Sequence, residues 1–114
     1  DGEVKIKKAS VLILGVTFKE NCPDVRNTKV IDVYHSLKSY GVEVDVFDPL
    51  AKKEDVRNEY HIDLIQELES NIYDAIVLAV SHDDFKNLEI KKFKKEGGVV
   101  YDVKNFLEQK DKTL

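Results

Sequence analysis

Apolar residues along the chain fall into continuous runs and alternating runs. Val11 to Leu14 leads without polar interruption into Gly15, and Tyr73 to Val80 is a second run of this kind, interrupted only by Asp74. Such runs are typical of strands buried on both faces of a parallel sheet. In residues 42–47, by contrast, valines alternate with other residues. This alternation predicts a half-exposed strand at the edge of the sheet.

Helical periodicity separates the predicted strands. Asn27 or Thr28 can cap a helix that Gly41 would end, because five side chains recur between them at three- and four-residue steps. These five are Val30, Val33, Tyr34, Leu37 and Tyr40. The polar sequence of residues 52–60 indicates a helix only weakly. Residues 62–68 indicate one more clearly, because Ile62, Leu64, Ile65 and Leu68 form an apolar stripe.

The last third of the chain completes the alternation. Ser81 is expected to cap a short helix through Phe85, Gly97-Gly98 precedes a last strand at 99–102, and 104–110 form a terminal helix or tail. Strands that alternate with helices, without an internal repeat, predict a small doubly wound, Rossmann-like α/β domain. We expect a parallel sheet of strand order 2-1-3-4 in residues 10–114, with 1–9 as a linker remnant.

Composition and charge narrow the function classes. The 114 residues are enough for one domain, and 22 acidic against 18 basic residues leave no general attraction for nucleic acid or an anionic membrane. No apolar run approaches the ~20 residues that span a bilayer, and no signal peptide is apparent, so a cytoplasmic protein is expected. Cys22 is the single cysteine, which excludes an internal disulfide and a Cys-rich metal site. The start at Asp1 suggests a piece of a longer protein.

The long polar loop after the first strand is the main candidate for binding chemistry. A helix can start only after Pro23, so Lys19 lies in this loop, as does Arg26. In an open α/β sheet, residues that follow the strands share one rim, where anionic ligands bind. That rim would bring Lys19, Arg26 and Lys104 together, although lysines and arginines in loops are more often merely solvated.

Other kinds of site fit the sequence less well. NAD binding would require Gly-x-Gly-x-x-Gly after the first strand, where only Gly15 is present, so the domain is not expected to bind NAD by itself. A phosphoryl-accepting receiver domain would need carboxylates there to hold magnesium. Cys22 has no recognisable base and precedes a proline, which favours a structural turn over a nucleophile. His82 is interpreted as a surface residue at a helix start rather than a catalytic base.

Four segments resemble one known family. They are GVTFKENCPDVR at 15–26, VFDP at 46–49, AVSHDDF at 79–85 and YDVK at 101–104. In this order and spacing they resemble the C-terminal domain of the UDP-glucose/GDP-mannose dehydrogenase family, over about residues 10–107. The first segment is similar to that of bacterial enzymes that oxidise UDP-N-acetylhexosamines for surface polysaccharides.

The resemblance implies an NAD-dependent UDP-sugar 6-dehydrogenase, active as a homodimer. Members oxidise C6 of the sugar to a carboxylate with two NAD⁺, through a thiohemiacetal on a cysteine. It implies an N-terminal domain that binds most of the NAD, a helical central domain that carries the cysteine, and this domain, which closes over the UDP end. The family cysteine lies in a glycine-flanked motif that is absent here. Cys22 therefore does not inherit its role, and the chain alone is expected to be inactive.

Residue by residue, the resemblance implies a small binding site without catalytic or metal-binding residues. Phe18 and Lys19 would lie at the nucleotide sugar. Because neighbouring side chains face opposite ways, we expect Phe18 to pack on the domain while the Lys19 ammonium faces the cleft. Arg26 would reach NAD across the cleft. Lys104 would lie at the substrate, where relatives often have an arginine, although lysine cannot make a bidentate phosphate contact. The alternative function is a free-standing nucleotide-binding or assembly module without catalysis.

Overall fold

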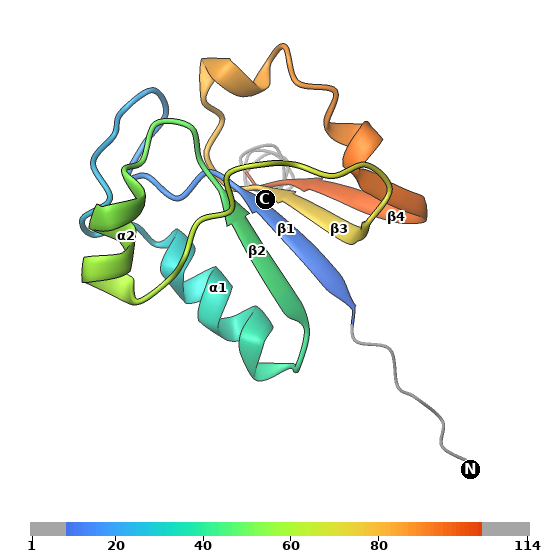
Figure 1. Ribbon diagram of the computed structural model, residues 1–114, viewed down its shortest axis with the longest axis horizontal. Helices are drawn as coiled ribbons and strands as arrows, with labels where there is room; N and C mark the ends of the chain where they lie inside the picture. Colours follow the sequence, from blue (N-terminus) through green and yellow to red (C-terminus); the bar gives the residue numbers. More distant parts are fainter. Residues whose placement is uncertain (1–8, 104–114) are drawn as a thin grey trace, which may run out of the picture.

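The computed structural model describes residues 9–103 as alternating strands and helices (Figure 1). Along the chain they are β1 (Ser10–Leu14), α1 (Val30–Ser39), β2 (Glu43–Phe47), α2 (Lys53–Tyr60), β3 (Tyr73–Leu78), the 3₁₀ turns η1 (Asp83–Phe85) and η2 (Ile90–Phe93), and β4 (Lys94–Asp102). The predicted tail at 104–110 and all but the last residue of the predicted linker lie outside the described residues.

The four strands form one parallel sheet of order β2-β1-β3-β4, which confirms the predicted topology (Figure 1). Leu14 at the end of β1 lies opposite Phe47 of β2 and Leu78 of β3, so these three strands end at the same level. The two continuous apolar strands lie in the centre, and the alternating strand β2 lies at an edge, as expected.

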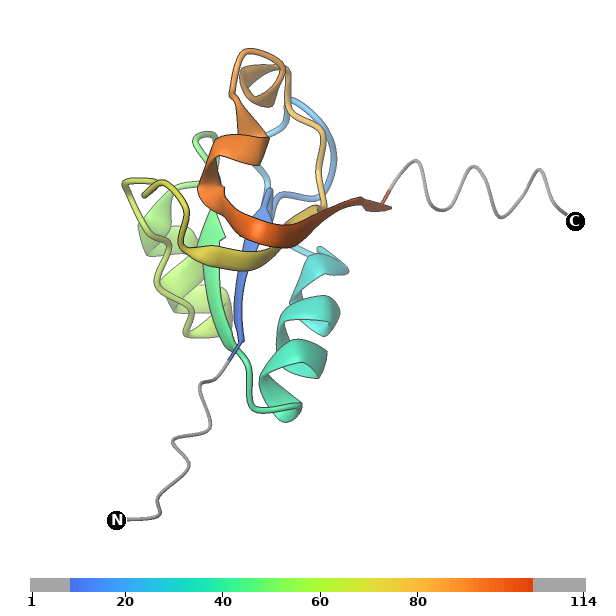
Figure 2. The same cartoon turned by 90° about the vertical axis from the view of Figure 1, so that its right-hand side faces the viewer.

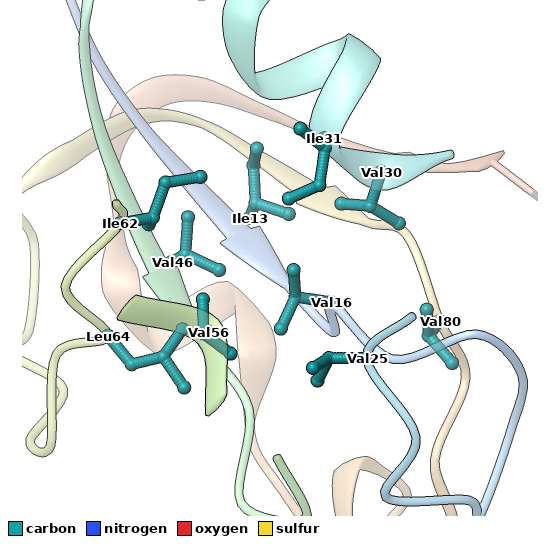
Figure 3. Close-up of a cluster of buried hydrophobic side chains, with 10 residues drawn as sticks. All are labelled: Ile13, Val16, Val25, Val30, Ile31, Val46, Val56, Ile62, Leu64 and Val80. Carbon is teal, nitrogen blue, oxygen red and sulfur yellow. The ribbon is translucent and has the colours of Figure 1, made fainter. Parts of the chain in front are cut away.

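The core lies on both faces of β1. Ile13 belongs to one buried cluster, in which side chains of α1 and α2 meet over β1 and β2 (Figure 3). Leu12 and Leu14 belong to the cluster on the other face, with Phe85 and Phe93 from the two 3₁₀ turns. Short 3₁₀ turns and extended chain, rather than α-helices, therefore cover this second face. No helix within residues 9–103 is long and apolar enough to cross a membrane.

The helix predicted for residues 62–68 is absent, and this prediction was wrong. The segment has no regular secondary structure, and the Ile65 N–H donates to the carbonyl of Val46 in β2 over 2.9 Å. Ile62 and Leu64 are buried in the first cluster, whereas Ile65 and Leu68 pack against the second. The apolar stripe therefore serves a chain that passes the edge of the sheet and contributes to both faces.

Two element boundaries follow from side-chain and backbone detail. Thr28 Oγ1 accepts the N–H of Val30 at the start of α1, so its predicted capping role holds, although Lys29 occupies the cap position. Gly41 follows the helix with φ +81°, the left-handed conformation expected of a glycine there. Ser81, by contrast, does not cap η1: His82 is its cap residue, and the Asp83 N–H donates to the side chain of Asn21.

The last strand is longer than predicted and includes Gly97 and Gly98, which were expected to precede it. β4 begins at Lys94, and its register against β3 shifts between Tyr73 and Ala75. A Cβ on Gly98 would lie 2.9 Å from the Lys95 carbonyl oxygen and 3.0 Å from that of Asp74, so glycine is needed at this irregularity. β4 is nearest the viewer in Figure 2, and its side chains at 99–101 are exposed.

Gly15 lets the two central strands approach each other as they end. Its φ is +95°, and a Cβ there would lie 2.6 Å from Cβ of Val80. The carbonyl of Leu14 accepts the N–H groups of both Ala79 and Val80. A side chain at position 15 would therefore push apart the ends of β1 and β3, where the loops of interest begin.

We expect Gly15→Ala to lower the free energy of unfolding by about 2–4 kcal/mol, because a positive φ and an overpacked contact act together. Gly41→Ala is the matched control: it has a similar φ but nothing within 4 Å of the added Cβ. The control should cost only ~1 kcal/mol. Urea unfolding followed by circular dichroism measures both, and equal losses would contradict the close-contact explanation.

Candidate functional site

The loops that follow β1, β2 and β3 gather at one end of the sheet (Figure 1). Val16 and Thr17 follow β1, Asp48 follows β2, and His82 lies four residues after β3. Side-chain hydrogen bonds connect all three loops, which confirms that they share the predicted rim.

Asp48 is the junction of this rim. Its Oδ2 accepts the Val16 N–H over 2.7 Å and lies 2.9 Å from Nε2 of His82. Its Oδ1 accepts the N–H groups of Leu50 and Ala51, at 2.8 and 3.1 Å, which shapes the turn after β2. An ionised carboxylate accepts hydrogen bonds only, and here four donors surround a side chain with no exposed surface.

His82 is buried, so its interpretation as a surface residue was wrong. The residue is 1% exposed. Its Nδ1 accepts the N–H of Asn21 at 2.9 Å, so this nitrogen carries no proton, and the proton lies on Nε2. Nε2 then donates to Asp48 and to Oγ1 of Thr17, which is 3.1 Å away. The partners therefore select one neutral tautomer, and with Nδ1 already occupied by an amide the ring has no free nitrogen for proton transfer.

Hydrogen bonds also close the loop after β1. Phe18 N–H donates to the carbonyl of Asp24 over 2.7 Å, and the Thr17 hydroxyl donates to the carbonyl of Lys19 over 3.0 Å. Asn21 adopts φ +60°, accepts the Asp83 N–H on its side chain and donates its own N–H to His82. The loop is thus tied both to itself and to the segment after β3.

Lys19 borders a hollow of about 330 Å³ at the ends of β1 and β3. Its lining residues are Phe18, Lys19, Glu20, Ala79, Val80, Ser81 and Val103. A neighbouring hollow of about 260 Å³ shares Phe18, Ala79, Val80 and Val103 and extends to the start of α1. Phe18 is 57% exposed, so the expectation that it packs on the domain was wrong.

Arg26 lies on the same loop but lines a different hollow. It is surrounded there by Asp24, Asp55 and Glu59. Asp24 accepts the backbone N–H, Nε and Nη2 of Arg26 at 2.9, 3.1 and 3.1 Å. The side-chain hydrogen bonds lower the pKa of the Asp24 carboxyl and raise that of the guanidinium. Lys19 and Arg26 therefore share a rim but not a hollow, and Lys104 lies outside the described residues.

The sequence interpretation missed the hydrogen-bonded network of Thr17, Asn21, Asp48 and His82. The sequence did contain a usable signal. Asp48 follows β2 and His82 follows β3, each within four residues of the strand's end, and both strands pair with β1. The rim argument that grouped the cations also places these two residues together. Hydrophobic periodicity gives no sign of the burial of His82, because the segment 81–84 is polar.

A family comparison covers most of the chain. Residues 12–109 match the family model described as the UDP-glucose/GDP-mannose dehydrogenase family, UDP binding domain.

Curated relatives agree with this match. The UDP-N-acetyl-D-glucosamine 6-dehydrogenase of Salmonella typhi is 48% identical over 97% of this chain and 27% of its own length. The protein with the same name from Pseudomonas aeruginosa is 45% identical over 93% of this chain and 26% of its own length. The chain thus spans about a quarter of the length of these relatives.

A solved structure shows the same fold. The UDP-N-acetyl-mannosamine dehydrogenase Cap5O from Staphylococcus aureus superposes with a TM-score of 0.64 and 25% identity, over 88% of this chain and 23% of that one.

The network leads to a stability prediction for Asp48. Asp48→Asn keeps the shape but turns an amide N–H₂ toward two donors, so we expect the free energy of unfolding to fall by about 2–4 kcal/mol. Asp63→Asn is the control, because Asp63 forms an exposed ion pair with Arg57 and should contribute at most ~1 kcal/mol. Urea unfolding of both variants tests this, and a loss at position 48 no larger than the control would contradict it.

Proposed function

Because the chain belongs to the UDP-glucose/GDP-mannose dehydrogenase family, we propose that it is the C-terminal, substrate-closing domain of an NAD-dependent UDP-sugar 6-dehydrogenase. The names of the relatives support a UDP-N-acetylhexosamine as the substrate. The observation that carries the proposal is the hollow beside Lys19 at the ends of the two central strands.

The position of this hollow favours a nucleotide ligand. In the order β2-β1-β3-β4, the chain leaves the neighbouring strands β1 and β3 toward opposite edges of the sheet. Open α/β sheets bind ligands in the crevice at such a switch point. Phe18, Lys19 and Glu20 line the hollow from the β1 side, and Ala79, Val80 and Ser81 line it from the β3 side.

The side chains at the hollow suit the UDP end of the substrate. An exposed phenylalanine ring offers an apolar surface that folding of this domain leaves uncovered. Lys19, the next residue, is exposed as well, while Asp24 on the same loop is paired with Arg26. When the domains close, the two phosphates lose water, and an ammonium offsets part of that cost.

The first loop does not provide the main site for NAD. Its glycine at position 15 is used to pack β1 against Val80, and no further glycine lets the backbone approach a pyrophosphate. A contact from Arg26 remains compatible with the geometry. Nε and Nη2 each donate one N–H to Asp24, which leaves three of the five guanidinium N–H groups for a ligand.

The proposal extends to the whole enzyme, of which this chain is about a quarter. The N-terminal domain would bind most of the NAD, which accepts hydride from C6 of the sugar. The central domain would supply the catalytic cysteine. Residues of this chain would bind and orient the substrate without taking part in bond making. We further propose a cytoplasmic homodimer, and Lys104 as an additional substrate contact.

Lys19→Ala in the full-length enzyme should raise the KM for the UDP-sugar about tenfold or more, because a charge-assisted hydrogen bond is worth roughly 1.5–3 kcal/mol. kcat should also fall if domain closure positions the sugar for hydride transfer. Lys38→Ala, at the exposed end of α1, is the control and should change neither. An unchanged KM and kcat in the Lys19 variant would contradict the proposal that Lys19 binds the substrate.

Arg26→Ala tests the cofactor contact separately. The KM for NAD should rise about tenfold, on the same estimate for a charge-assisted hydrogen bond, while the KM for the UDP-sugar stays nearly constant. Steady-state kinetics with each substrate varied in turn measures this. A selective rise in the UDP-sugar KM would instead place Arg26 at the substrate.

A further inference from the structure

We propose that His82 is a positioning residue for UDP binding, and that its imidazole holds the loop on both sides of Lys19 so that the ammonium stands at the hollow. The inference rests on the proposed function, because it assigns His82 a part in binding the same ligand. His82 itself reaches no ligand, since it is 1% exposed and lies beneath the loop.

Val16 and Val25 anchor the two ends of the loop in the core, but residues 18–21 between them have no hydrophobic anchor of their own. The side chains of residues 18–21 are all exposed, so burial of apolar surface cannot decide the shape of this segment. Its conformation depends instead on hydrogen bonds, and Asn21 even adopts a positive φ. A segment of this kind is ordered only as well as the groups that hold its backbone.

His82 contacts residues on both sides of Lys19, the side chain of Thr17 and the backbone of Asn21. On the near side, Nε2–H donates to Thr17 Oγ1, and this hydroxyl in turn donates to the carbonyl of Lys19. On the far side, Nδ1 accepts the N–H of Asn21, two residues after the lysine. One ring therefore holds the carbonyl of Lys19 through Thr17 and the N–H of Asn21 directly.

The ring is itself held firmly. Asp48 Oδ2 accepts its Nε2–H, and this carboxylate also accepts the N–H of Val16 where β1 ends. The ring of Phe85 lies against the imidazole, with centroids 5.5 Å apart. Buried side chains thus connect the backbone of Asn21 to the end of β1 and fix its position relative to the sheet.

Preorganisation gives this arrangement a functional consequence. A loop already held in its binding conformation loses less entropy when the ligand binds. If the ring is replaced by one without nitrogens, the core volume is kept but the Asn21 N–H loses its acceptor. Lys19 would then sample positions away from the hollow, and the affinity for UDP would fall without any change to a residue that touches it.

The test uses the full-length enzyme and UDP alone, measured by titration calorimetry at a temperature where each variant is folded. His82→Phe should weaken UDP binding about tenfold, the loss expected when one charge-assisted contact is misplaced, and leave NAD binding within about twofold. His82→Asn can place an amide oxygen near the position of Nδ1 and should recover most of the UDP affinity. His35→Phe, at an exposed position of α1, should change neither ligand.

A double-mutant cycle separates positioning from a general loss of structure. If His82 acts through Lys19, then His82→Phe should add little to the loss already caused by Lys19→Ala, so the two effects are not additive. Additive losses, equal losses for UDP and NAD, or an Asn variant no better than the Phe variant would each overturn the inference.

Three further outcomes keep the test decisive. If His82→Phe does not fold, the comparison is between His82→Gln, which can still donate toward Asp48, and His82→Asn; equal UDP affinity of these two would overturn the inference. If Lys19→Ala weakens UDP binding but His82→Phe does not, the inference fails and the proposed function stands. If Lys19→Ala itself has no effect, the proposed site fails as well.

Discussion

The buried carboxylate of Asp48 joins the ends of the three strands from which the rim is built. It accepts a backbone N–H from the end of β1, two from its own turn after β2, and the imidazole N–H of His82 after β3. A buried charge is tolerated only when its hydrogen-bonding capacity is filled, and here four donors fill it. The relative positions of three loops, far apart in the sequence, therefore depend on one side chain.

This rigid base supports a surface that the domain itself leaves uncovered. Thr17, Asp48 and His82 of the network are buried, while Phe18 and Lys19 on the loop after β1 are exposed. Buried groups that hold exposed binding groups are the usual means of preorganising a site. In a chain that spans about a quarter of the length of its relatives, an exposed phenylalanine at the rim is consistent with the ligand-binding face proposed above.

The electrostatics of the loop divide it into two parts. Beside Lys19 the hollow is lined mainly by apolar side chains with Glu20 and Ser81, whereas Arg26 lies among Asp24, Asp55 and Glu59. Asp24 already takes two of the guanidinium N–H groups, so Arg26 is oriented by its own loop. Lys19 and Arg26, seven residues apart, thus lie in different environments, in line with the proposal that they contact different ligands.

Local patterns in the sequence determined much of this protein. Continuous and alternating apolar runs distinguished the central strands β1 and β3 from the edge strand β2, because burial on two faces or one is a property of a single strand. Gly15 and Gly41 marked backbone conformations that are local as well, and the loop motifs indicated the family. The tertiary structure decided the rest. The stripe at 62–68 fits a helix equally well, until the edge of β2 draws Ile65 into a hydrogen bond and splits the stripe between two faces. The burial of His82 and the separation of Arg26 from Lys19 likewise depend on partners distant in the chain or on how a long loop folds, which no local pattern specifies.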